Sequence, residues 1–295
     1  MPDDMVPLKA GAFRVRTAGD PAAPMLLMLH GFPEHSGAWA EMFERLSDAF
    51  FCVAPDQRGY GLSPRPPEVE AYQVHHLVAD AMGVLDHYRP GATVRAVVGH
   101  DWGASVSYAL AMRAPERIEK LVIANGVHPV PFQRALVESP AQAAASQYIH
   151  FLRSEGSETK LAEDDGGGVI RELWHRMDTS WLTPEKEAEY RDAWRQPGAL
   201  RGMVNWYRAT PLAVPKPGET LPTPPLLQMD PAPLRIRMPH LLLWGMRDEA
   251  LLPESRAGLE AFCDDLTVIE VPDADHWIFH QKPDLCAKAI RDFVS

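Results

Sequence analysis

The sequence has few cysteines and no excess of positive charge. Its 295 residues include three cysteines, Cys52, Cys263 and Cys286, at spacings that match no metal-binding motif. Such a small, odd number argues against a disulfide framework and favours a reducing compartment. The formal net charge is −11 and no stretch forms a basic stripe, which argues against nucleic acid or an anionic membrane surface as a partner.

Long apolar runs and a basic leader are also missing. The first strongly apolar stretch, 25–29, is far too short to cross a membrane, and residues 1–4 lack the positive charge typical of a signal peptide. We therefore expect a soluble, cytoplasmic protein without a membrane partner. No cluster of metal ligands and no phosphate-binding loop is present, so we expect neither a metal nor an organic cofactor.

Short apolar segments alternate with segments of helical periodicity along most of the chain. This alternation predicts an α/β protein with a mostly parallel, doubly wound sheet. The expected strands are 13–17, 25–29, 51–54, 93–98, 120–124, 240–244 and 266–271. The expected helices beside them are 39–50, 72–88, 104–111, 254–263 and 284–293.

The alternation stops between residues 128 and 234. This region contains no short β-rich run, and proline-rich residues 211–239 predict an extended return path. Helix-like pieces are expected instead at 135–152, 168–177, 184–195 and 200–210, with a flexible loop at 164–168. We predict a core domain formed by residues 1–127 and 235–295, with residues 128–234 inserted as a helical cap over the carboxyl edge of the sheet.

Residues 99–103 read Gly-His-Asp-Trp-Gly and join an expected strand to an expected helix. A G-x-S-x-G nucleophile elbow has this arrangement, but here Asp101 occupies the serine position. A carboxylate at such a turn can attack an alkyl carbon and form an ester. Taken alone, the motif is equally consistent with a strand-capping aspartate beside an ordinary glycine turn.

Two later residues can complete a catalytic set with Asp101. Hydrolysis of an ester needs a base that activates water, most often a histidine oriented by a carboxylate. Asp248 and His276 each follow one of the last two strands, in the order nucleophile, acid, base. Negative charge on the ester carbonyl needs backbone N–H donors, for which Phe32 and Trp102 are the candidates.

Three other motifs accompany the elbow. Residues 30–34 read His-Gly-Phe-Pro-Glu, residues 56–63 read Asp-x-Arg-Gly-Tyr-Gly-x-Ser, and residues 205–208 read Asn-Trp-Tyr-Arg. Together with Asp101 they resemble the epoxide hydrolase branch of the α/β-hydrolase family, over nearly the whole chain. The resemblance implies an α/β-hydrolase fold with a cap, and conversion of a small-molecule epoxide to a vicinal diol through an aspartyl ester. It also implies that Tyr207 donates to the epoxide oxygen, while Trp206 and Arg208 pack or pair within the cap.

The second cap donor departs from the common pattern, which has another tyrosine. His150 is the position that matches best, as in a smaller branch of epoxide hydrolases with a His/Tyr pair, and Tyr148 is the alternative. On a helix the two side chains lie about 200° apart, so only one of them can face the nucleophile. The substrate is expected to contact Phe32, Trp102, Tyr148, His150 and Tyr207.

Other functions compete with this interpretation. A haloalkane or haloacid dehalogenase could use the same aspartate, but haloalkane dehalogenases have an asparagine in place of Phe32. Fluoroacetate dehalogenases have arginines after the nucleophile, where this chain has Trp102 and Ser105. A serine esterase would need a serine where this chain has Asp101. A non-catalytic binding protein would not need a nucleophile, an acid and a base together. The substrate's identity and the oligomeric state, including a homodimer, stay open.

Overall fold

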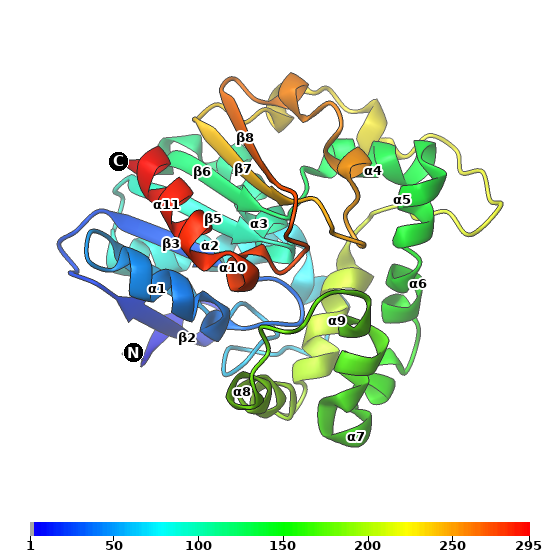
Figure 1. The fold of residues 1–295 in the computed structure, drawn as a ribbon, viewed down its shortest axis with the longest axis horizontal. Helices are drawn as coiled ribbons and strands as arrows, with labels where there is room; N and C mark the ends of the chain where they lie inside the picture. The colour runs from blue at the N-terminus through cyan, green and yellow to red at the C-terminus, as the bar shows by residue number, and fades with distance from the viewer. Residues whose placement is uncertain (1–2) are drawn as a thin grey trace.

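An eight-stranded sheet forms the centre of the computed structural model, which describes residues 3–295 (Figure 1). The strand order is β1-β2-β4-β3-β5-β6-β7-β8; β2 is antiparallel to β1 and β4, and the remaining neighbours are parallel. The strands are β1 Asp3–Leu8, β2 Gly11–Ala18, β3 Met25–Leu29, β4 Phe51–Pro55, β5 Val94–His100, β6 Ile118–Ala124, β7 His240–Gly245 and β8 Leu266–Val271. The predicted mostly parallel, doubly wound sheet is confirmed.

The apolar runs form strands because both faces of the sheet are covered. All five side chains of β3 are buried; Leu27 and Leu29 join the core on one face, while Leu26 and Met28 join the core on the other. Alternate side chains of a strand point to opposite faces, so a strand between two helical layers is apolar at every position.

Helices cover the two faces in separate layers (Figure 1). On one face, α2 Val74–Tyr88 packs against α3 Trp102–Arg113. On the other face, α1 Ala40–Leu46 packs with α10 Ile278–Gln281 and α11 Pro283–Val294. The carboxyl ends of β3, β5, β6, β7 and β8 meet at one edge of the sheet, where open α/β folds bind their ligands.

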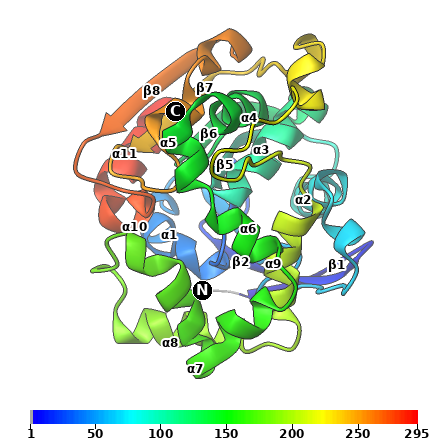
Figure 2. The same ribbon diagram turned by 90° about the vertical axis from the view of Figure 1, so that its right-hand side faces the viewer.

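The segment between β6 and β7 is helical, and it lies beyond that edge (Figure 1). Figure 2 shows α6 and α9 side by side in this group, which their contacts support. Its helices are α4 Pro129–Glu138, α5 Pro140–Ala145, α6 Tyr148–Arg153, α7 Ser157–Glu172, α8 Pro184–Trp194 and α9 Ala199–Ala209. This arrangement is compatible with the proposed cap at 128–234. Among residues 3–295, no helix has the length and apolar character needed to cross a membrane.

Several predicted helices are wrong in detail, and proline or glycine explains two of them. The helix expected at 135–152 is three helices, and Pro140 explains the first of the two breaks because it lacks the N–H that a continuous helix would use there. The helix expected at 254–263 is two 3-10 turns separated near Gly258, which has a left-handed φ of 82°. The loop expected at 164–168 is a kink inside α7, with left-handed backbone at Asp164 and Asp165.

Candidate active site

Asp101 stands at the turn between β5 and α3 with an unusual backbone conformation. Its φ is 49° and its ψ is −118°, a region that costs a non-glycine residue free energy and is found mainly at functional sites. The turn closes tightly against the neighbouring strand. A Cβ atom on Gly103 would lie 2.0 Å from the carbonyl oxygen of Leu29, so only glycine fits at this position.

Two backbone N–H groups act on the Asp101 carboxylate. The N–H of Phe32 donates to Oδ1 at 2.7 Å, and the backbone N–H of Trp102 lies close enough to lower the pKa of the carboxyl. Burial raises the pKa of Asp101 above its ordinary value, while His276, His100 and these two N–H groups oppose the rise. The two sequence-predicted donors therefore meet at the predicted nucleophile.

His276 connects the carboxylates of Asp101 and Asp248. Its Nδ1 lies 2.7 Å from Oδ2 of Asp248, and its Nε2 lies 3.7 Å from Oδ2 of Asp101. Burial alone would lower the pKa of His276, but the charges of Asp248 and Asp101 outweigh it and raise the pKa to about 9. The structure thus brings together the three residues that the sequence analysis selected.

Asp248 is held ionised by a set of donors. Burial would raise its pKa, but the charge and hydrogen bond of His276 and bonds from Leu251 and Asn125 keep the pKa below the ordinary value. The N–H groups of Ala250 and Leu251 donate to Oδ1 at 2.8 and 2.9 Å, and Asn125 Nδ2 donates to Oδ2 at 2.8 Å. Sequence reasoning missed Asn125, although its position directly after β6 offered the same signal that selected the acid and the base.

Tyr207 lies on α9 and is buried among aromatic rings. Its ring centroid is 5.0 Å from that of Trp102 and 5.1 Å from that of Phe32. Burial raises the pKa of Tyr207 well above its usual value, and the negative charge of Asp101 raises it further. The phenol therefore keeps its proton at neutral pH.

Tyr148, and not His150, is the α6 side chain that shares this environment. The ring of Tyr148 lies 6.1 Å from that of Tyr207. Burial, and then the charge of Asp101, raises the pKa of Tyr148. His150 has a buried Nε2 that finds no hydrogen-bond partner within residues 3–295. These contacts favour Tyr148 over the sequence-based preference for His150, and the identity of the second cap donor stays a proposal.

A buried polar cluster behind the base was also missed. Glu34 accepts hydrogen bonds from Tyr190 of α8 at 2.8 Å and pairs with His280 at 2.7 Å and His100 at 3.2 Å. His100 Nε2 lies 2.8 Å from the carbonyl oxygen of His276. A charged residue directly after the His-Gly-Phe-Pro stretch, and a histidine inside the elbow, were signals that could have pointed to it.

Comparison with known proteins agrees with this geometry. A family model described as the α/β hydrolase fold matches residues 24–154. An α/β-hydrolase superfamily protein of Bacillus subtilis is 32% identical over 95% of this chain and 93% of its own. The chain belongs to the α/β-hydrolase family. Epoxide hydrolase A of Mycobacterium tuberculosis is 30% identical to this α/β-hydrolase over 96% of the chain and 94% of the relative.

A solved structure is also similar to this chain over its whole length. A structure described among novel epoxide hydrolases from metagenomes of hot environments superposes with a TM-score of 0.90 at 35% identity. It covers 100% of this chain, and this chain covers 98% of it. The predicted family resemblance is therefore confirmed, and the protein is an α/β-fold hydrolase with epoxide hydrolases among its relatives.

Proposed function

We propose that this α/β-hydrolase converts an epoxide to a vicinal diol through an ester on Asp101. One observation carries the proposal: a half-buried carboxylate is surrounded by two backbone N–H groups, an aspartate-backed imidazole and two phenols. Each group matches one requirement of the two-step reaction. The relatives named epoxide hydrolases support the same assignment.

In the first step, the Asp101 carboxylate attacks a ring carbon of the epoxide. A carbon–oxygen bond forms to the carboxylate as the ring carbon–oxygen bond breaks, and Tyr207 or Tyr148 gives a proton to the departing oxygen. Because burial raises the pKa of both phenols, each holds its proton at neutral pH until the oxygen becomes basic. Without such a donor, an alkoxide would leave poorly in a site shielded from water.

Esterification removes the Asp101 charge that helps to raise the pKa of His276, which favours the neutral imidazole. In the second step, this neutral His276 removes a proton from water, which attacks the ester carbonyl carbon. Negative charge then develops on the carbonyl oxygen, within reach of the Phe32 and Trp102 N–H groups. Asp248 stabilises the imidazolium that forms. Collapse of the intermediate breaks the bond between the acyl carbon and the diol oxygen. The diol oxygen takes the proton of the His276 imidazolium, and the proton left on the Asp101 carboxyl passes to the phenolate formed in the first step, which restores both the carboxylate and the phenol.

The same carboxylate could displace halide, but the surrounding residues favour the epoxide. Phe32 places an aromatic ring against Tyr207, where a haloalkane dehalogenase would hold halide with an asparagine amide. Trp102 and Ser105 offer no cation for a substrate carboxylate. Two phenols, in contrast, suit a substrate whose oxygen must be protonated.

The test is a panel of styrene, aliphatic and trans-disubstituted oxiranes scored for diol, with fluoroacetate and a bromoalkane scored for halide. We expect diol from at least one oxirane, no halide, and no diol from Asp101→Asn. Halide release that exceeds diol formation would favour the dehalogenase instead. Diol formation retained by Asp101→Asn would show that the nucleophile lies elsewhere.

A further inference from the structure

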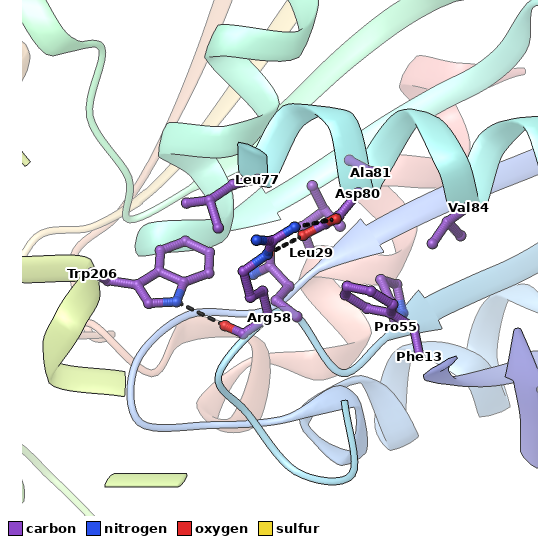
Figure 3. Close-up of a pocket in the computed structure, with 10 residues that line it drawn as sticks. Phe13, Leu29, Pro55, Arg58, Leu77, Asp80, Ala81, Val84 and Trp206 are labelled. Carbon is purple, nitrogen blue, oxygen red and sulfur yellow. Dashed lines mark hydrogen bonds and ion pairs between the residues drawn. The ribbon is translucent and has the colours of Figure 1, made fainter. Parts of the chain in front are cut away.

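Trp206 joins the helix that carries Tyr207 to the core of the protein. Its indole Nε1 donates to the carbonyl oxygen of Arg58 at 2.8 Å, and both residues are buried (Figure 3). Arg58 lies in the loop that follows β4, so this bond crosses from α9 to the sheet. The Trp206 hydrogen bond therefore leads out of the cap segment, whereas Arg208 pairs within it, with Glu158.

The carbonyl that receives Trp206 is itself fixed in place. The Nε and Nη2 atoms of Arg58 each donate to Asp80 of α2 at 2.7 Å (Figure 3). Its Nη1 donates to the Ala71 carbonyl at 3.0 Å. A planar guanidinium held by three such bonds has little rotational freedom. A bond to its carbonyl therefore ties α9 to a helix that packs directly on the sheet.

The backbones of α9 and this loop also touch. A Cβ atom on Gly202 would lie 2.7 Å from the Cα of Gly59 and 2.9 Å from its carbonyl oxygen, so neither side has room for a side chain. Gly59 has a φ of 93°, which other residues rarely adopt. The two contacts lie one helical turn apart on α9, because Gly202 and Trp206 are separated by four residues.

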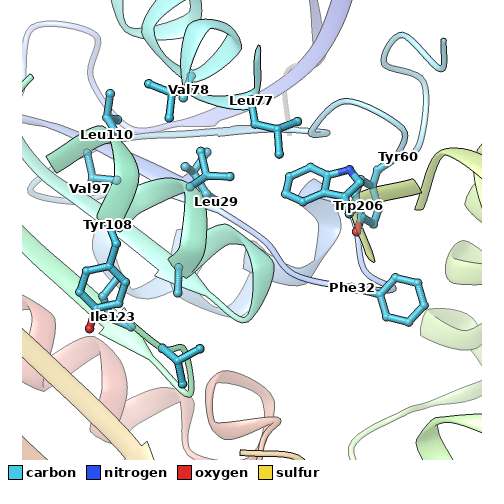
Figure 4. Close-up of a cluster of buried hydrophobic side chains, with 14 of the residues drawn as sticks. Leu29, Phe32, Tyr60, Leu77, Val78, Val97, Tyr108, Leu110, Ile123 and Trp206 are labelled. Atoms are coloured by element: carbon cyan, nitrogen blue, oxygen red, sulfur yellow. The ribbon is translucent and has the colours of Figure 1, made fainter. Parts of the chain in front are cut away.

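These contacts set how α9 is rotated about its axis. Neighbouring residues on a helix point about 100° apart, so fixing Trp206 also fixes the direction of Tyr207. The Trp206 ring lies 5.5 Å from Tyr60, with Leu77 beside it in Figure 4, and 5.8 Å from Trp102. The Tyr207 ring also lies against Trp102, but it meets Phe32 on the side of the nucleophile.

We propose that Trp206 and Arg58 are positioning residues that aim the Tyr207 phenol at the epoxide oxygen. Asp80 belongs to the same set because it holds the Arg58 guanidinium. None of the three touches the reacting atoms; they act through the orientation of α9. This inference rests on the proposed function, since it concerns the proton donor of the first step.

Trp206→Phe tests the inference, because it keeps an aromatic ring and removes only the Nε1 donor and part of the indole. Single-turnover kinetics with the best oxirane should show ester formation slowed by about tenfold and ester hydrolysis changed by less than about twofold. In a Tyr207→Phe background, Trp206→Phe should cause no further loss, because the phenol that it positions is gone. Equal slowing of both steps, or an additive loss in the double variant, would overturn the inference.

Two further variants separate positioning from a general loss of stability. Trp39→Phe makes the same change at a buried indole whose Nε1 has no partner within residues 3–295, and it should leave both steps unchanged. Gly202→Ala improves helix propensity but pushes α9 away from Gly59, so it should slow ester formation selectively. Full activity in Gly202→Ala would count against the inference.

If the wild-type protein forms no ester with any oxirane, the proposed function itself fails, which is a different result from additive losses in an active enzyme.

Discussion

His276 Nε2 lies 3.7 Å from Oδ2 of Asp101, while its Nδ1 lies 2.7 Å from Asp248. The longer distance is beyond a hydrogen bond, so the imidazole is anchored to the acid and does not occupy the nucleophile. Asp101 can attack with its own oxygen, and the imidazole remains available for water in the next step. The difference between the two distances therefore leaves Asp101 to act in the first step and His276 to act in the second.

The first prediction is that His276→Gln traps the ester. Asp101 should still open the epoxide, but no base remains to activate water, so the alkyl-enzyme accumulates. Intact-protein mass spectrometry should show an increase equal to the mass of the whole epoxide, because ring opening adds the substrate without losing an atom. Asp101→Asn is the control and should show no increase; an adduct in that variant would mean that another residue is alkylated.

The second prediction distinguishes the two candidates on α6. Tyr148→Phe should slow ester formation by roughly 10- to 100-fold, since it removes one of two proton donors and leaves the ring in place. His150→Gln should change ester formation by less than about threefold, because the ring contact with Tyr207 comes from Tyr148 and we assign the second donor to that phenol. A larger effect from His150→Gln than from Tyr148→Phe would restore the sequence-based preference.

The third prediction concerns stability and pH. The folded-state pKa of His276 is about 9 against 6.5 in the ordinary state, so the protonated form favours folding. This contribution is fully present below pH 6.5 and is lost as the pH rises through 9. Its size is at most about 3.5 kcal/mol, at about 1.4 kcal/mol for each pKa unit. Urea unfolding at both ends of this pH range should show a fall in the free energy of unfolding that is smaller in His276→Gln; identical falls would contradict the assigned shift.

The fourth prediction compares two helical glycines. Gly103→Ala would place a Cβ 2.0 Å from the Leu29 carbonyl oxygen, and we expect it to lower the free energy of unfolding by about 1–3 kcal/mol. Gly83→Ala, in α2, meets only the end of the flexible Leu8 side chain at 3.0 Å and gains helix propensity, so it should be neutral or stabilising. Urea unfolding measures both, and equal stability of the two variants would argue against the tight elbow.

The sheet could be predicted well because a strand that is buried on both faces is apolar at every position of its sequence. A fully apolar run such as Met25–Leu29 can be read locally, and so can the residues that follow a strand at its carboxyl end. The positions of Asp101, Asp248 and His276 at one edge of the sheet follow from that rule. The strand β1 escaped prediction because its side chains are mostly exposed and leave no apolar pattern.

The parts of the site that sequence could not predict depend on orientation and on distant contacts. Tyr148 and His150 differ only by the rotation of a short helix, and that rotation is set by packing against α9. Asn125 bonds to Asp248, and Trp206 bonds to Arg58, each across more than a hundred residues of chain. No local pattern encodes such pairs, although each partner occurs in or beside a motif that the sequence displays.

The most direct test of the central claim is one turnover in water enriched in the heavy isotope of oxygen, with enzyme in excess over epoxide. If Asp101 forms the ester, the diol from the first turnover carries ordinary oxygen from the carboxylate, and the heavy isotope is found in the peptide that contains Asp101. If water attacks the epoxide directly, the first diol carries the heavy isotope and Asp101 remains unlabelled, which would contradict the account.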